Sequence, residues 1–180
     1  MKLPDRLDSE RLTLRPWAGT DAAALQSVVL NNVGHLRNWM PWATPEGHAD
    51  LREVARRLTA FGDAFASGLD FGYVMTDRID GTLIGAVGVH PRLGPDVLEI
   101  GYWIRADYSG RGLVTEAVGA LVDMIFSATD VTLIEIRCDP RNAPSAAVAR
   151  RAGFTHVETR VTDVDGIGTR ETMIWELRRA

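Results

Sequence analysis

Near the middle of the chain, the spacing of hydrophobic residues changes its period from two to about 3.6. Over residues 98–105, Leu98, Ile100, Tyr102 and Ile104 alternate with Glu99, Gly101, Trp103 and Arg105, a period of two that is typical of a β-strand. From about Gly112 to Ser127 the apolar residues recur every three or four positions, which predicts a helix with one apolar stripe. The sequence Ser-Gly-Arg-Gly at 109–112 joins the two. Glycines permit unusual dihedrals, and the first turn of a helix offers free N–H groups and partial positive charge. This turn is therefore a candidate phosphate site.

The glycine spacing alone does not decide between a phosphate site and a tight turn without a ligand. No Gly-Lys-Ser/Thr follows, so the turn is not a Walker loop. The third glycine of the dinucleotide-binding pattern is also missing.

The same patterns predict the remaining elements. Strands are expected over 11–15, 71–76, 83–89, 132–138, 155–161 and 169–177, and helices over 22–31, about 50–68 and 142–153. Short turns make the strands between 71 and 104 an antiparallel meander, and the strand–helix–strand unit 98–138 implies parallel pairing. The order predicts one α/β domain over residues 1–180, with a mixed sheet of about seven strands and helices on both faces.

Composition narrows the class of protein. A chain of 180 residues with 46% hydrophobic and 24% charged residues suits a single globular domain. The net charge of -4 argues against bulk nucleic-acid binding. Cys138 is the only cysteine, so no internal disulfide can form, and a lone strand cysteine is more often packing than a nucleophile. No apolar run approaches ~18 residues, so no membrane span is expected. With no signal-like N-terminus, we expect a cytoplasmic protein.

Four segments resemble one family in the same order along the chain. They are Ser-Glu-Arg-Leu-Thr-Leu-Arg-Pro (9–16), Glu-Ile-Gly-Tyr-Trp-Ile (99–104), Tyr-Ser-Gly-Arg-Gly-Leu-Val-Thr-Glu-Ala (108–117) and Asn-Ala-Pro-Ser…Gly-Phe (142–154). They are similar to the GNAT superfamily of N-acetyltransferases, and more narrowly to its RimJ/RimL-type ribosomal-protein branch. The resemblance implies a GNAT-like fold in which the fourth and fifth strands splay apart around acetyl-CoA. It also implies direct acetyl transfer to a primary amine without a metal.

The branch resemblance favours a protein N-terminal α-amine as acceptor. A small amine, an amino acid or an antibiotic is the alternative within the enzyme class. A sensor module that binds acyl-CoA without catalysis, or a plain interaction domain, are alternatives of other classes. A homodimer is left open by the exposed apolar loop around Trp39 and Trp42.

The resemblance assigns a set of positions to CoA. The phosphate donors are backbone N–H groups of the turn, and Asn142 would hold the pantetheine arm; a strand N–H would polarise the thioester carbonyl. The positions are Tyr102, Trp103, Ile104, Gly110, Arg111, Gly112, Leu113, Val114, Thr115, Asn142 and Arg150 (or its neighbour Arg151). The chain departs from the family's Gln/Arg-x-x-Gly-x-Gly/Ala pattern at Ser109 and Val114. The first departure removes a side-chain phosphate contact, and the second loosens cofactor packing.

Amine acetylation needs a base, and the leaving thiolate needs a proton. Glu99 is the first candidate for the base, because it shares its strand face with Gly101 and Trp103; an ion pair with Arg137 or Arg105 is the alternative. Ser145, in the Asn-x-x-Ser position, is the candidate proton donor, and the alternative is a bond within its helix's first turn.

Trp39, Trp42 and Asp163 are the candidate substrate-binding residues. The two tryptophans lie in an irregular stretch that either pins a loop to the core or forms an aromatic wall for the acceptor. Asp163 lies in the final hairpin, which borders the acceptor site in the resembling family. The four histidines are scattered without ligand spacing, so no metal site is predicted.

Overall fold

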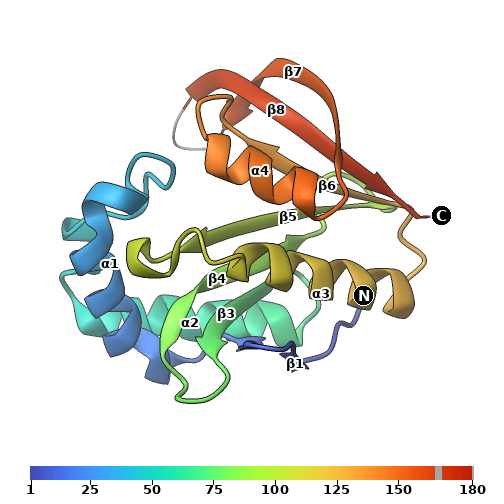
Figure 1. Ribbon diagram of the computed structural model, residues 1–180. Coiled ribbons are helices and arrows are strands. Elements are labelled where there is room, and N and C mark those ends of the chain that lie inside the picture. Colours follow the sequence, from blue (N-terminus) through green and yellow to red (C-terminus); the bar gives the residue numbers. More distant parts are fainter. Residues whose placement is uncertain (165–167, 180) are drawn as a thin grey trace.

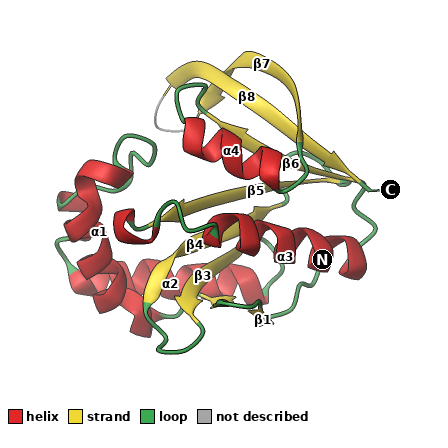
Figure 2. Cartoon of the chain, viewed as in Figure 1, coloured by secondary structure: helices red, strands yellow, loops and turns green. Residues whose placement is uncertain are grey.

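The computed structural model describes residues 1–164 and 168–179, except for the side chains of residues 163 and 164. Its strands form one mixed sheet in the order β1-β2-β3-β4-β5-β6-β8-β7 (Figures 1 and 2). The strands are β1 (Leu7–Asp8), β2 (Leu12–Pro16), β3 (Phe71–Asp77), β4 (Leu83–His90), β5 (Val97–Ile104), β6 (Leu133–Cys138), β7 (Thr155–Val164) and β8 (Gly168–Arg178). The α-helices are α1 (Ala22–Leu36), α2 (Leu51–Ala66), α3 (Leu113–Ala128) and α4 (Ala143–Arg151). No helix in the described part of the chain is long and apolar enough to cross a membrane.

The predicted fold is confirmed, with the two-residue β1 as an additional strand. The meander β3-β4-β5 is antiparallel, and β5 and β6 pair in parallel across the crossover helix α3. Helix α2 begins after Asp50, whose carboxylate accepts from the Arg52 backbone N–H at 2.8 Å. Helix α4 is capped by Asn142 and followed by Gly153 at φ 89°.

The first predicted helix is wrong at its C-terminal end, because α1 continues five residues beyond residue 31. Asn31 and Asn32, at the predicted end, donate their side-chain amides back along the helix to carbonyls four residues earlier, at 2.9 and 2.8 Å. Leu36 in the added turn is 2% exposed, so core packing stabilises the extension.

The alternation of the central strands divides the core between two faces of the sheet. Val74, Ala86 and Trp103 pack with α1 and α2, whereas Val87 and Ile100 pack with α3. Figure 1 shows α3 and α2 on opposite sides of the strands. Successive side chains of β5 therefore point into two different layers of the core.

The pairing of β5 with β6 ends after three residue pairs. Val97, Leu98 and Glu99 pair with Leu133, Ile134 and Glu135, and beyond them the two strands separate. Strand β6 continues beside β8 as far as Cys138, and β5 continues beside β4 as far as Ile104. A gap thus opens in the middle of the sheet, as the resemblance implied.

Candidate active site

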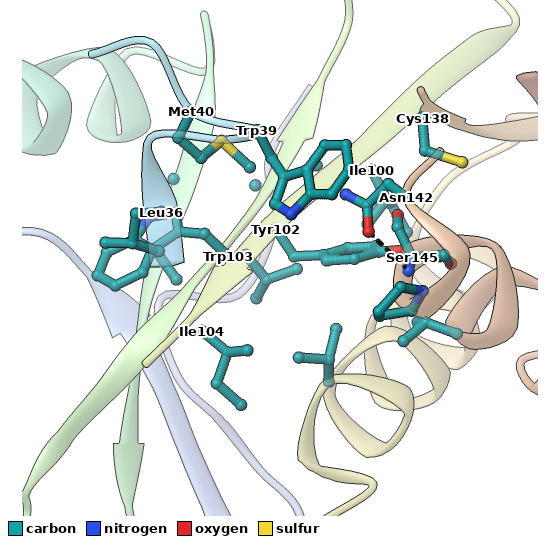
Figure 3. Close-up of a pocket in the computed structure, with 18 of the residues that line it drawn as sticks. Leu36, Trp39, Met40, Ile100, Tyr102, Trp103, Ile104, Cys138, Asn142 and Ser145 are labelled. Atoms are coloured by element: carbon teal, nitrogen blue, oxygen red, sulfur yellow. Dashed lines mark hydrogen bonds between the residues drawn. The ribbon is translucent and has the colours of Figure 1, made fainter. Parts of the chain in front are cut away.

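A cavity of about 890 Å³ occupies the gap between β5 and β6. The turn before α3 and the start of α4 line it from one face of the sheet, and the end of α1 with α2 lines it from the other. In Figure 3, Trp39 and Met40 lie on one side of Tyr102, and Asn142, Ser145 and Cys138 lie on the other. One cavity therefore reaches both layers, so two molecules that enter from opposite faces can meet in it.

The turn before α3 presents a row of backbone donors. Within residues 1–164 and 168–179, no group accepts from the N–H groups of residues 110–115. Gly110 and Gly112 hold φ values of 75° and 77°, which L-residues rarely adopt. Leu113 and Val114 are buried beneath the turn and fix the helix start. The donors and the helix dipole suit an anionic phosphate.

The acidic side chain in the first turn of α3, Glu116, is paired with groups outside the phosphate turn. Glu116 accepts from the Ser9 hydroxyl at 2.7 Å, from the Arg11 backbone N–H at 2.8 Å and from its guanidinium at 2.7 Å. Burial alone would raise the pKa of Glu116, but these hydrogen bonds lower it overall. Its negative charge is therefore balanced by Arg11 and does not oppose an anion at the turn.

The cationic side chains predicted for CoA are only partly brought together. Arg111 lies outside the cavity lining; its guanidinium stacks 4.9 Å from the Tyr108 ring centroid, and its carbonyl accepts from Arg11. Arg150 is exposed and also outside the lining, whereas its neighbour Arg151 lines the cavity. The geometry thus favours Arg151 over Arg150 for a phosphate contact.

Ser145 lies beside a tyrosine hydroxyl that sequence reasoning assigned only to the strand backbone. Tyr102 Oη lies 2.9 Å from Ser145 Oγ and 3.1 Å from the Ser145 carbonyl oxygen. The Ser145 backbone N–H donates to the Asn142 side chain at 3.2 Å, which fixes the start of α4. Burial raises the pKa of Tyr102, so this phenol stays protonated and can donate. Burial likewise raises the pKa of the adjacent Cys138 thiol.

Glu99, the predicted base, lines the cavity with 9% of its side chain exposed. Both of its carboxylate oxygens accept from the Arg92 guanidinium, at 2.6 and 3.0 Å. Arg137 Nε lies 3.9 Å from the same carboxylate. Glu99 therefore stands at the predicted place but in an ion pair, and its role as base stays a prediction.

The two predicted tryptophans line the cavity on the α1 side. Trp42 is 43% exposed and packs edge-on to Trp103, with ring centroids 5.7 Å apart. His48 lies 5.9 Å from Trp42, and burial lowers its pKa, which keeps the imidazole neutral at pH 7. Trp39, Trp42 and Trp103 together are the aromatic wall. The side chain of Asp163 lies outside the described residues; its backbone pairs with Thr169.

Sequence reasoning missed two charged features of the cavity. His90 Nδ1 lies 2.6 Å from an Asp70 carboxylate oxygen, and both residues line the cavity. Arg57 of α2 and Arg92 after β4 also line it. No motif links these positions: Arg57 lies in α2, Asp70 just before β3, and His90 and Arg92 at and after the end of β4. The only available signal was the parity of His90 with Gly88 on β4.

Comparison with known proteins agrees with this geometry. Residues 11–155 match the family model described as the acetyltransferase (GNAT) domain. The chain therefore belongs to the GNAT family and is an N-acetyltransferase, which confirms the resemblance seen in the sequence.

Among relatives, the chain is 28% identical over 148 residues to YdaF of Bacillus subtilis strain 168, described as a candidate ribosomal N-acetyltransferase; the match covers 81% of this chain and 79% of YdaF. It is 25% identical over 148 residues to the ribosomal-protein-serine acetyltransferase of Escherichia coli K12, covering 81% and 80%. The structure of Mycobacterium smegmatis RimJ in complex with CoA-disulfide has the same fold. Its TM-score is 0.83 at 24% identity, covering 99% of this chain and 90% of that one.

Proposed function

We propose that this protein transfers the acetyl group of acetyl-CoA directly to a primary amine, the N-terminal α-amine of a protein. The observation that carries the proposal is the single cavity through the β5–β6 gap. It joins the unpartnered N–H groups of residues 110–115 on one face to the aromatic wall on the other. A donor and an acceptor bound from opposite faces would meet in one ternary complex, which supplies proximity and orientation.

The residues on the cofactor face fit acetyl-CoA. The N–H groups of residues 110–115 would bind the pyrophosphate, and Asn142 would hold the pantetheine arm. Backbone N–H groups of β5 near Tyr102 would polarise the thioester carbonyl. The Tyr102–Ser145 hydroxyl pair would protonate the departing sulfur, because its phenol remains protonated at neutral pH.

The acceptor face supports a polypeptide N-terminus. Trp42 in the wall and Phe61 of α2 are both exposed at the cavity, at 43% and 50%, so the acceptor side opens to solvent over a broad apolar surface. An extended chain can enter such an opening, whereas a small amine would leave much of it uncovered. The names of the ribosomal-protein relatives point to the same class.

The test uses acetyl-CoA and two octapeptides that begin with serine or alanine and carry one internal lysine. Calorimetry measures acetyl-CoA binding, thiol release measures turnover, and fragment mass spectrometry locates the acetyl group. We expect binding, turnover and α-acetylation, with no turnover of the same peptides blocked at the N-terminus. If only the internal lysine or only free amino acids were acetylated, the proposed N-terminal acceptor would be wrong. Binding without turnover would indicate a sensor, and no binding would refute the proposal.

A further inference from the structure

Asp70 and His90 form a hydrogen-bonded pair on the acceptor face of the sheet. Asp70 immediately precedes β3, and His90 is the last residue of β4. His90 Nδ1 lies 2.6 Å from an Asp70 carboxylate oxygen, and both residues line the cavity. An ionised carboxylate only accepts, so in the neutral imidazole Nδ1 carries the proton and Nε2 keeps its lone pair. The aspartate thus selects the tautomer in which Nε2 can accept a proton.

The imidazole lies over two glycines of the cavity lining, and Nε2 is the ring atom nearest to both. A Cβ built on Gly88 would meet His90 Nε2 at 2.6 Å, and one built on Gly101 would meet it at 3.5 Å. These glycines pair across β4 and β5, so the ring occupies space that a side chain would otherwise fill. Gly101 stands two residues beyond the last β5–β6 pair, where the gap opens. In the described part of the chain, no group makes a hydrogen bond with Nε2.

The parity of β5 places this nitrogen opposite the proposed proton donor. Gly101 faces the side of α1 and α2, while the neighbouring Tyr102 faces α4 and contacts Ser145. One strand therefore separates the His90 imidazole from the Tyr102 phenol. An acceptor amine on one face would have the His90 imidazole beside it, and a leaving thiolate on the other face would have the Tyr102 phenol.

We infer that His90 is the general base of the acetyl transfer and that Asp70 is its positioning residue. The inference rests on the proposed function. His90 Nε2 takes one proton from the substrate ammonium, and the neutral amine nitrogen bonds to the acetyl carbon as the carbon–sulfur bond breaks. The thiolate takes a proton from the Tyr102–Ser145 pair, and the second nitrogen proton leaves the new amide through water and replaces it on that pair. The net products are the N-acetylated amine, free CoA thiol and one proton, which His90 returns to water.

Glu99 competes with His90 for this role and is less available. The two residues pair in register across β4 and β5, but both Glu99 oxygens are engaged by Arg92. A carboxylate in this geometry must give up a charged hydrogen bond before it can take a proton. The Arg92–Glu99 pair is thus better placed to shape the acceptor entrance than to carry the proton.

Other charged or titratable side chains that line the cavity on the acceptor side affect the pH dependence. They are His35 of α1, His48 before α2, Arg57 of α2, Arg92 after β4, Glu99 of β5, Arg137 of β6 and Arg170 of β8. The proposed variants change one group at a time and leave the arginines and the other two histidines in place.

The test measures kcat/KM against pH for the unaltered protein, His90→Gln, Asp70→Asn and Glu99→Gln, with acetyl-CoA and the serine and alanine peptides. We expect His90→Gln to lower kcat/KM about 10²–10⁴-fold and to abolish the limb on the acid side of the profile. Asp70→Asn should lower kcat but keep that limb. His90→Gly with added imidazole should regain activity, while Glu99→Gln should keep the limb. Melting temperature and calorimetric acetyl-CoA affinity control for folding.

The outcomes distinguish an error in the assignment of His90 as base from an error in the proposed function. Should His90→Gln retain the wild-type profile, or should Glu99→Gln alone remove the acid limb, the dyad is not the base although the transferase stands. No imidazole rescue of a folded, CoA-binding His90→Gly variant would equally overturn it. No turnover of either peptide by the unaltered protein removes the proposed function, and the dyad with it.

Discussion

The turn before α3 allows a substitution whose effect on stability can be separated from its effect on ligand binding. Gly110 has φ 75°, lines the cavity, and a Cβ added to it would meet no protein atom within 4 Å. Gly81, in the turn between β3 and β4, has φ 73° and equally open surroundings, but it does not line the cavity. Gly110→Ala and Gly81→Ala therefore carry the same backbone strain, and only the first places a methyl group before the N–H donors.

The magnitudes follow from this geometry. A left-handed alanine costs about 1–2 kcal/mol, and the stiffer unfolded chain offsets roughly 0.4–1 kcal/mol of it. Both variants should thus lose about 1 kcal/mol, which lowers the melting temperature by roughly 2–4 °C. Loss of one hydrogen bond to a charged phosphate costs about 1.5–3 kcal/mol. Gly110→Ala should therefore bind acetyl-CoA roughly 10- to 100-fold more weakly, and Gly81→Ala should bind it like the unaltered protein.

Calorimetry with acetyl-CoA and with acetyl-pantetheine, which lacks the pyrophosphate, gives the decisive comparison. The affinity of Gly110→Ala for acetyl-CoA should fall, while its affinity for acetyl-pantetheine should match that of the control. Equal acetyl-CoA affinities in the two alanine variants would refute the assignment of this turn to phosphate. An equal loss for both ligands would show that the substitution disturbs the whole cofactor face.

Three further predictions concern other parts of the cavity. Tyr102→Phe should lower kcat about 10-fold or more and leave the KM for acetyl-CoA unchanged; a double-mutant cycle with Ser145→Ala should be non-additive, and additive effects would separate the two hydroxyls. Trp42→Ala should raise the KM of the peptide acceptor with little change in melting temperature, because the residue is 43% exposed, and an unchanged KM would remove Trp42 from the acceptor site. Hydrogen bonds from Arg141 lower the pKa of Asp139 to about 2, so this pair stabilises the fold above the unfolded-state value of about 4 and loses its contribution as pH falls toward 2. Asp139→Asn should therefore show a smaller drop in melting temperature between pH 5 and 2 by calorimetry, and parallel curves for the two proteins would contradict it.

Local patterns predicted most of the fold, including the glycine turn before α3 and the start of α4; the assignment of that turn to CoA came from the family resemblance. The glycines at 110 and 112 and the cap at Asn142 act within a few residues, so their structural consequences can be read from adjacent letters. The end of α1 could not be read in this way. It depends on the burial of Leu36, which the rest of the chain provides.

The Asp70–His90 pair shows why the acceptor face was harder to predict. Near the turn, Thr76 pairs with Leu83, and regular pairing from there would place position 70 opposite Val89. A register shift between Met75 and Thr76 instead pairs Phe71 with Val89, which brings Asp70 beside His90. One irregular residue in a strand thus decides which side chain the aspartate meets. Hydrophobic alternation does not reveal such a shift.

The short pairing between β5 and β6 divides the molecule mechanically. Within the sheet, only three residue pairs join a five-stranded plate, β1 to β5, to a three-stranded plate of β6, β8 and β7 in the described part of the chain, and the rest of the connection is the α3 crossover, its packed core and the Tyr102–Ser145 contact (Figure 1). A ligand wedged between the plates touches both, so its binding energy adds to the cohesion of the smaller one, by about 2.7 kcal/mol at a hundredfold excess over Kd. Amides of β6 and β8 should then exchange with deuterium more slowly in the CoA-bound protein, while those of β3 change little. Bound CoA would then hold the two plates of the sheet together as well as take part in the reaction.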